Sequence, residues 1–181
     1  MEVVKYVDDI KFCYCKTCKQ WKQYTKFNRD NSNLHNNRGG LCTQCKECQR
    51  KRYYEERNRI LNNDYLALKY KLNAALKSAK RRCKEYNRFI DIDLDYLFYL
   101  WNKQNGKCAL TGMDMTYKFY EGRVNSNLSI DRIDSSKGYT KDNVQLVCMV
   151  ANQMKNDLSL EEFINICANV INYNKTKKQE D

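Results

Sequence analysis

The chain has 181 residues, with 33 Lys or Arg, 22 Asp or Glu, 10 Cys, one His and no Pro, a size that fits one or two small domains. Its mean hydropathy is −0.86, and no apolar run approaches the ~20 residues of a bilayer span, which excludes a membrane protein. The first ten residues hold three acids and no apolar signal-peptide core. We therefore expect an intracellular protein whose cysteines bind metal rather than form disulfides.

Positive charge is concentrated in the first half of the chain. Residues 1–90 carry 22 basic and 9 acidic side chains, whereas residues 91–181 carry 11 and 13. A basic half of this density suits a polyanion, because each neutralised phosphate releases condensed counterions. We expect double-stranded DNA as the partner, and a lysine-rich surface that serves solubility alone is the open alternative.

Six of the ten cysteines lie before residue 49. Two Cys-x-x-Cys pairs are suited to close a tetrahedral thiolate site around a structural Zn²⁺: Cys15 with Cys18, and Cys45 with Cys48. Cys42 with Cys45 is an alternative second pair. A helix-forming run begins directly after Cys45, at Lys46, and this favours Cys45 with Cys48 as the ligands. The polar stretch 28–40 between the pairs is typical of a loop ordered by the metal. We predict a zinc module over residues 1–50.

Two helices are expected next, over residues 46–62 and 64–86. In the second, apolar residues recur at steps of three and four and predict one buried face: Tyr65, Leu68, Leu72, Leu76, Ala79 and Cys83. Basic side chains lie largely off this face, and segment 51–90 is therefore assigned to DNA binding. The expected DNA-binding residues are Arg50, Lys51, Arg52, Lys80, Arg81, Arg82, Lys84 and, further on, Lys137. Helical tyrosines are expected to pack, with base stacking as the alternative.

The remaining residues, 91–181, predict an α+β domain. Asp93 is expected to cap a third helix that stops at Asn105-Gly106. Short strands are expected over 128–133 and 144–147, followed by a helix over 149–157. Ser159 and Glu162 form a capping box for a last helix. Its expected packing face consists of Phe163, Ile164, Cys167, Val170 and Ile171.

The strand, loop, strand and helix predicted over residues 128–157 resemble the HNH, or ββα-metal, nuclease family. In that family a hairpin and one helix hold a divalent cation against the scissile phosphate. Asp131 matches the acidic metal ligand, Asn143 the middle Asn, and Asn152 the last motif position. The resemblance implies Mg²⁺ or Mn²⁺ on Asp131 and Asn152, since both are hard oxygen ligands, and implies that Asn143 bridges the hairpin loop.

The first His of the family motif is replaced by Arg132. A guanidinium cannot take a proton from water at neutral pH, so Arg132 is expected to stabilise negative charge on the phosphate. Some members that resemble this pattern pair Asp-Arg with a Tyr eight residues after the Asp, which matches Tyr139. Tyr139 is therefore the expected base or attacking oxygen. His35, the one histidine of the chain, is the other candidate acid or base.

The core departs from the family in a second way. Many HNH nucleases carry zinc on Cys-x-x-Cys pairs around the hairpin, but here the runs read Cys108-Ala-Leu-Thr111 and Cys148-Met-Val-Ala151. Half of the ligands are missing, so we expect Cys108 and Cys148 to be buried without zinc.

These motifs together predict three parts: a four-cysteine zinc module (1–50), a basic helical segment (51–90) and a ββα nuclease core (91–181). The expected function is a metal-dependent DNA endonuclease, a hydrolase of homing or restriction type that leaves 5′-phosphate and 3′-hydroxyl ends. It would act as a monomer or a homodimer. The Asn-, Lys- and Tyr-rich composition resembles that of phage or large-virus nucleases. The alternative is a non-catalytic, repressor-like zinc protein that binds DNA.

Overall fold

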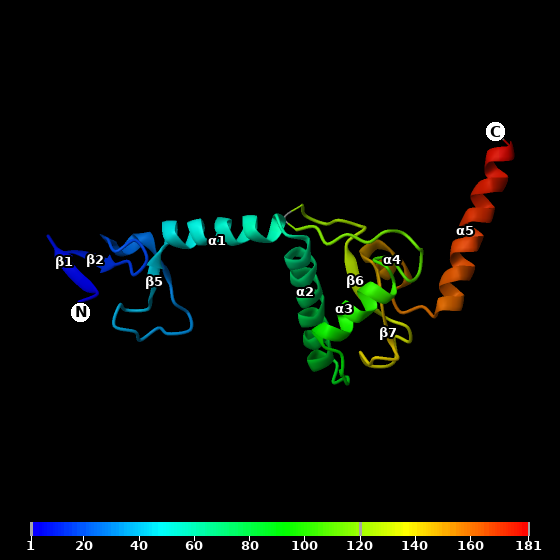
Figure 1. Ribbon diagram of the computed structural model, residues 1–181, viewed down its shortest axis with the longest axis horizontal. Helices are drawn as coiled ribbons and strands as arrows, with labels where there is room; N and C mark the ends of the chain where they lie inside the picture. The colour runs from blue at the N-terminus through cyan, green and yellow to red at the C-terminus, as the bar shows by residue number, and fades with distance from the viewer. Residues whose placement is uncertain (1, 120, 181) are drawn as a thin grey trace. The chain divides into compact units, whose positions relative to one another are not determined.

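The computed structural model describes residues 2–119 and 121–180, and the chain forms two units, Met1–Asn62 and Asn63–Asp181 (Figure 1). This differs from the three-part division expected from the sequence. Helix α1 (Lys46–Leu61) belongs to the first unit and buries only Ile60, whereas α2 (Asp64–Glu85) belongs to the second. Helix α2 does not form a separate segment because its apolar face is part of the second core.

The first unit is built from short antiparallel strands and one helix. Strands β1 (Val4–Val7), β2 (Ile10–Tyr14) and β3 (Trp21–Gln23) form one sheet in that order. A 3-10 turn, η1 (Tyr24–Lys26), leads to β4 (Phe27–Arg29), which pairs with β5 (Leu41–Cys45). Helix α1 begins directly after β5. Three of the five residues in this unit's buried core are cysteines, which is too little apolar surface to stabilise the unit without further support.

A buried arginine anchors the loop between β4 and β5. Arg38 is 2% exposed, and its guanidinium donates hydrogen bonds to the carbonyl oxygens of Tyr14 and, at 3.2 Å, Cys42. It also lies 5.7 Å from the centre of the Phe27 ring. This anchor satisfies backbone acceptors on two strands, and nothing in the polar composition of the loop pointed to it.

The second unit is organised around the hairpin of β6 (Leu128–Arg132) and β7 (Val144–Cys148). Helix α4 (Met149–Lys155) follows β7 without a break, so the strand, strand and helix order expected from the sequence is present. Helices α2 and α3 (Leu94–Lys103) pack against the hairpin on one side and α4 on the other (Figure 1). The hairpin residues Leu128, Ile130, Leu146 and Val147 are buried in this core.

Side-chain caps define where the helices of the second unit begin. The Asn63 and Asp93 side chains accept hydrogen bonds from the backbone N–H groups of Leu66 (2.9 Å) and Tyr96 (2.8 Å). The Asp93 cap was expected from the sequence. Tyr65, in contrast, is not part of the buried face as expected. It is 59% exposed in the first turn of α2, where its ring stacks on Phe98.

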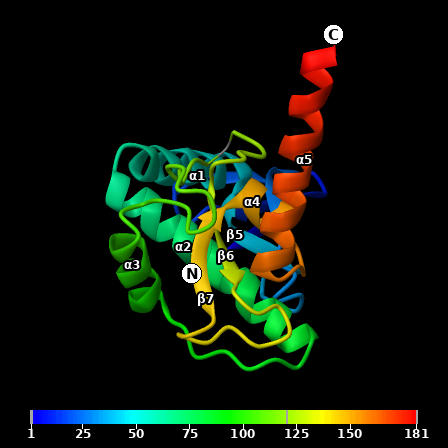
Figure 2. The same cartoon turned by 90° about the vertical axis from the view of Figure 1, so that its right-hand side faces the viewer.

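The last helix, α5 (Leu160–Glu180), begins with the expected capping box. The Ser159 hydroxyl lies 2.7 Å from a Glu162 carboxylate oxygen and accepts from the Glu162 N–H. The expected packing face is wrong for most of its length, because only Phe163 of that face is buried. Helix α5 contacts α4 near its start and then extends away from the rest of the second unit (Figure 2). No helix within the described ranges has the length and apolar character of a membrane span.

Candidate functional site

Four thiols converge in the first unit. The sulfur atoms of Cys15, Cys18, Cys45 and Cys48 all lie within 4.8 Å of one another. This confirms Cys45 with Cys48 as the second pair. Cys42 is excluded from the group, and its Sγ lies 3.4 Å from the carbonyl oxygen of Arg29. Four thiolates from two knuckles are the ligand set of a structural Zn²⁺ site.

Backbone amides prepare one of these thiols for metal. Burial disfavours the Cys15 thiolate, but N–H groups directed at its sulfur, including that of Cys45 at 3.3 Å, lower the pKa of Cys15 to about 6. Burial and the neighbouring thiols raise the pKa of Cys48 to about 12. Four thiols this close cannot all lose their protons without a cation among them, so the geometry fits a metal-bound group.

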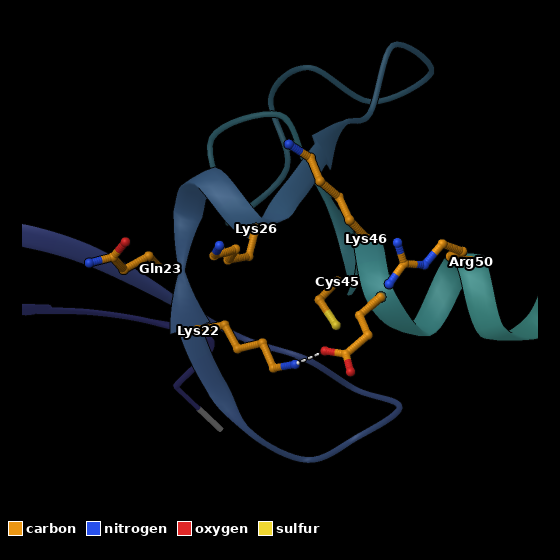
Figure 3. Close-up of a pocket in the computed structure, with 7 residues that line it drawn as sticks. Lys22, Gln23, Lys26, Cys45, Lys46 and Arg50 are labelled. Carbon is orange, nitrogen blue, oxygen red and sulfur yellow. Dashed lines mark hydrogen bonds and ion pairs between the residues drawn. The ribbon is translucent and has the colours of Figure 1, made fainter.

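A basic cavity of about 610 Å³ lies beside these cysteines, at the start of α1 (Figure 3). Its lining includes Lys22, Lys26, Lys46 and Arg50. Lys22 donates to Glu47 at 2.7 Å, and Lys46 donates to the carbonyl oxygen of Thr25 at 2.8 Å. The first unit thus concentrates positive charge where a helix presents its N-terminal N–H groups.

A second cavity, of about 380 Å³, lies in the second unit where β6, the hairpin loop and α4 meet. Four residues that the sequence assigned to chemistry line it: Asp131, Arg132, Tyr139 and Asn152. Arg82 of α2, which was expected to contact a DNA phosphate, lines the same cavity. His35 is not among the lining residues and lies exposed in the β4–β5 loop of the first unit.

Asp131 is held on both carboxylate oxygens. It is 4% exposed, and its Oδ2 accepts a hydrogen bond from Gln145 at 2.9 Å. Its Oδ1 lies 3.3 Å from the ammonium of Lys155, which is fully buried and also donates to the carbonyl oxygen of Arg132 at 3.1 Å. The sequence analysis missed Lys155. The available signal was its position three residues after Asn152, on the same face of a helix.

The Asn152 amide is oriented by the strand it faces. Its Nδ2 donates to the Ser129 hydroxyl at 2.7 Å and to the carbonyl oxygen of Ile130 at 3.2 Å. Engagement of the nitrogen with β6 leaves the amide oxygen for a ligand on the cavity side. One carboxylate and one amide oxygen are hard donors, so the donor types fit Mg²⁺ or Mn²⁺ rather than Zn²⁺.

Two arginines lie close to the Tyr139 ring. The guanidinium carbons of Arg82 and Arg132 are 5.5 and 5.4 Å from the ring centre, and the Arg82 Nε donates to the phenol oxygen at 2.8 Å. The Arg132 guanidinium also donates to the Lys137 carbonyl oxygen at 3.1 Å. The hydrogen bond from Arg82 thus fixes the orientation of the phenol.

The backbone at Tyr139 is hydrogen-bonded to the segment 89–91, which follows α2. The Tyr139 N–H donates to the carbonyl oxygen of Phe89 at 3.0 Å, and its own carbonyl accepts from the Asp91 N–H at 3.2 Å. Gly138 permits this approach, because a Cβ at that position would lie 2.2 Å from the Phe89 carbonyl oxygen. The position of the phenol therefore depends on a residue without a side chain.

Asn143 connects the two ends of the hairpin loop. Its Nδ2 donates to the carbonyl oxygens of Asp134 (3.0 Å) and Gly138 (2.8 Å), and its Oδ1 accepts from the Asp134 N–H at 2.9 Å. The Ser136 hydroxyl and N–H, together with Lys137, lower the pKa of Asp134 to about 2. Lys137 lies 3.2 Å from the Asp134 carboxylate. These bonds hold the loop that carries Tyr139.

Cys108 and Cys148 are both buried in the second core. Burial raises the pKa of Cys148 to about 11, with the neighbouring Cys108 as a further cause. Burial disfavours the Cys108 thiolate, but hydrogen bonds from the Thr111 hydroxyl and from backbone N–H groups, including that of Cys148, lower the pKa of Cys108.

Comparisons with known proteins found viral relatives and one structural neighbour, whereas no family model matches. The chain is 31% identical over 107 residues to an uncharacterized 29.0 kDa protein of Enterobacteria phage T4, a match covering 59% of this chain and 39% of that protein. It is 41% identical over 56 residues to the uncharacterized protein R423 of Acanthamoeba polyphaga mimivirus, covering 31% and 10%. The chain thus spans less than half of either relative.

The structural neighbour is the rare-cutting HNH restriction endonuclease PacI. The TM-score is 0.40 at 15% sequence identity, and the match covers 82% of this chain and 86% of that one. Both sequence relatives are viral, which fits the expectation from composition.

Proposed function

We propose that the chain is a divalent-metal-dependent DNA endonuclease of HNH type, with its active site in the cavity of the second unit. The supporting observation is that one cavity gathers Asp131, Asn152 and a tyrosine flanked by two arginines. A carboxylate, an amide and paired guanidinium groups are the side chains that a phosphodiester and a hard cation require.

Asp131 and Asn152 would hold Mg²⁺ or Mn²⁺. When bound, the cation would supply stabilisation of negative charge on the phosphate and on the departing 3′ oxygen. Lys155 keeps the Asp131 carboxylate directed across the end of β6, and Ser129 does the same for the Asn152 amide. The protein thereby fixes two oxygen ligands before any metal arrives.

Tyr139, Arg82 and Arg132 would carry out the part of the reaction that protein side chains perform. The phenol oxygen either removes a proton from the attacking water or attacks phosphorus itself, and Arg82 stabilises the negative charge on that oxygen. Arg132 would contact the phosphate and stabilise the five-coordinate transition state. In either route the bond between phosphorus and the 3′ oxygen would break, and that oxygen would take a proton from solvent to become the 3′-hydroxyl. Attack by water would give the 5′-phosphate directly, whereas attack by the phenol would give a phosphotyrosyl ester that a water would then hydrolyse to the 5′-phosphate.

The basic surfaces would bind the duplex. Exposed cations lie on α1 (Arg50, Lys51, Arg52), on α2 (Lys80, Arg81, Lys84) and in the hairpin loop (Lys137). The zinc group would stabilise the first unit, whose basic cavity suits a backbone phosphate (Figure 3). These contacts read the phosphate backbone and carry no base specificity.

Plasmid cleavage tests the proposal. Supercoiled DNA incubated with the protein and Mg²⁺ or Mn²⁺ is expected to be nicked or cut, and EDTA is expected to stop the reaction. Tyr139→Phe is expected to lower the cleavage rate by about 10²- to 10⁴-fold while DNA affinity is kept. Tyr99→Phe is the matched control, because Tyr99 is exposed and does not line the cavity. Wild-type rates in Tyr139→Phe would remove the hydroxyl from the chemistry.

A second candidate is a non-catalytic DNA-binding protein. It is favoured by one observation, namely that the Asp131 carboxylate already has an ammonium partner in Lys155. An intact plasmid at high protein excess with either cation, together with retained DNA binding, would support this candidate and contradict the endonuclease.

A further inference from the structure

Helix α5 presents large apolar side chains to solvent. Ile164 and Ile171 are 55% and 53% exposed, and Leu160 and Val170 are comparably exposed. Phe163 is the one buried residue of α5 in the part whose side chains are described. An apolar helix surface of this extent in a chain with a mean hydropathy of −0.86 indicates an interaction surface.

Three of the exposed apolar residues, together with the half-buried Cys167, have the spacing of a helix-pairing seam. Leu160, Ile164, Cys167 and Ile171 follow one another at steps of four, three and four, which places them in a line along one side of the helix. The helix has 21 residues and is therefore about 30 Å long. A seam of this kind is covered most directly by a second helix with the same spacing.

The charges of α5 indicate which helix covers the seam. Its first turn carries Glu161 and Glu162, whereas the last of its described side chains is that of Lys175. A second copy of α5 in antiparallel orientation places the acidic first turn of each helix near Lys175 of the other. The same register brings Ile164 beside Ile171 of the second copy, with Cys167 near the two-fold axis.

We propose that α5 joins two copies of this chain as an antiparallel helix pair. A two-fold interface must be self-complementary, and the apolar middle and opposite terminal charges of α5 satisfy this condition within one helix. A different partner protein would not require such symmetry of α5. The proposal rests on α5 alone and does not depend on the endonuclease activity.

Molecular mass in solution tests the interface. The full-length wild-type protein is expected to be a dimer by size-exclusion chromatography with light scattering. Ile171→Glu is expected to raise the dimer dissociation constant by about 100-fold or more, because it buries an unpaired charge at two symmetric places. Asn169→Glu is the matched control, since it adds the same charge to an exposed position two residues away, on another side of the helix. It is expected to remain dimeric.

A mixing experiment tests the orientation. Ile171→Glu alone and Ile164→Lys alone are each expected to be monomeric. In an antiparallel pair, mixing the two variants places the new acid beside the new base and leaves Ile164 beside Ile171 at the other contact, so a heterodimer is expected. A parallel pair would bring each position against itself, and the mixture would stay monomeric, which would contradict the antiparallel register.

Two further results would overturn the proposal. A monomeric wild type across the concentration series would mean that another part of the chain or another protein covers α5. A dimer that persists in Ile171→Glu would mean that the interface lies elsewhere. Far-UV circular dichroism of each variant separates the loss of pairing from the loss of folding.

Discussion

Among single residues, Gly138 controls the position of the Tyr139 phenol without contributing a side chain. We predict that Gly138→Ala lowers the cleavage rate by about 10²-fold, because the added Cβ forces the loop away from Phe89 and displaces Tyr139. Gly112→Ala is the control, since no atom lies within 4 Å of its added Cβ, and any loss there reflects only the strain of its positive φ of 71°, which Gly138 does not have. Cleavage rates and melting temperatures of both variants check this. Equal losses in the two variants would argue against a positional role for Gly138.

Lys155 is fully buried and pairs with the buried Asp131 carboxylate, so replacing it should lower the stability of the folded protein. We predict that Lys155→Met lowers the free energy of unfolding by about 3 kcal/mol or more, because it leaves the Asp131 carboxylate buried without its ammonium partner. Adding Asp131→Asn to this variant should recover part of the loss. Urea unfolding of the four members of this cycle gives the coupling energy, and additive effects would show that the pair does not interact.

The sequence predicted four of the residues that line the cavity of the second unit, but it did not predict the contacts that other parts of the chain make with them. Asp131, Arg132, Tyr139 and Asn152 were found because the motif spacing survives in one continuous stretch. The contact of Arg82 with Tyr139 joins residues 57 positions apart, so local spacing carries no sign of it. In the sequence, Lys155 resembles an exposed helix lysine. Its burial follows only from the packing of α4 against β6.

Among the elements, the short strands of the first unit are expected to depend most on zinc, because the four-thiol group lies among them. We predict that chelating zinc unfolds this unit while the helices of the second unit remain, since the first core is small and rich in cysteine. Limited proteolysis before and after chelation checks this and should cut first between residues 1 and 62.

Cys45→Ser should reproduce the effect of the chelator, and Cys42→Ser should not, because Cys42 is outside the four-thiol group. Resistance of the first unit to both treatments would contradict a structural role for zinc.

Helices were predicted more accurately than strands, for physical reasons. Helices α2 and α3 carry apolar periodicity and side-chain caps, which are local signals. Strands β1 to β3 have three to five residues and pair mainly through backbone hydrogen bonds. Their side chains therefore give little sign in the sequence that these residues form strands. The face of α5 was recognised as apolar, but its sequence does not state whether the same chain covers it.

Over the whole molecule, charge should govern affinity for DNA. We predict that Lys80→Ala with Arg81→Ala weakens binding for all sequences alike and reduces the salt dependence by about one slope unit per lost phosphate contact. Both residues are exposed on α2 and neither lines the cavity. Binding titrations at several salt concentrations give the slope. An unchanged slope would place the duplex on another surface.

Helix α2 also carries Arg82, between the exposed Arg81 and the buried Cys83, and Arg82 bonds the Tyr139 hydroxyl. In the proposed enzyme, the helix whose exposed cations hold the duplex would also be the helix that orients the phenol. One element would then serve both substrate capture and catalysis, and a substitution that displaces α2 would weaken the two together.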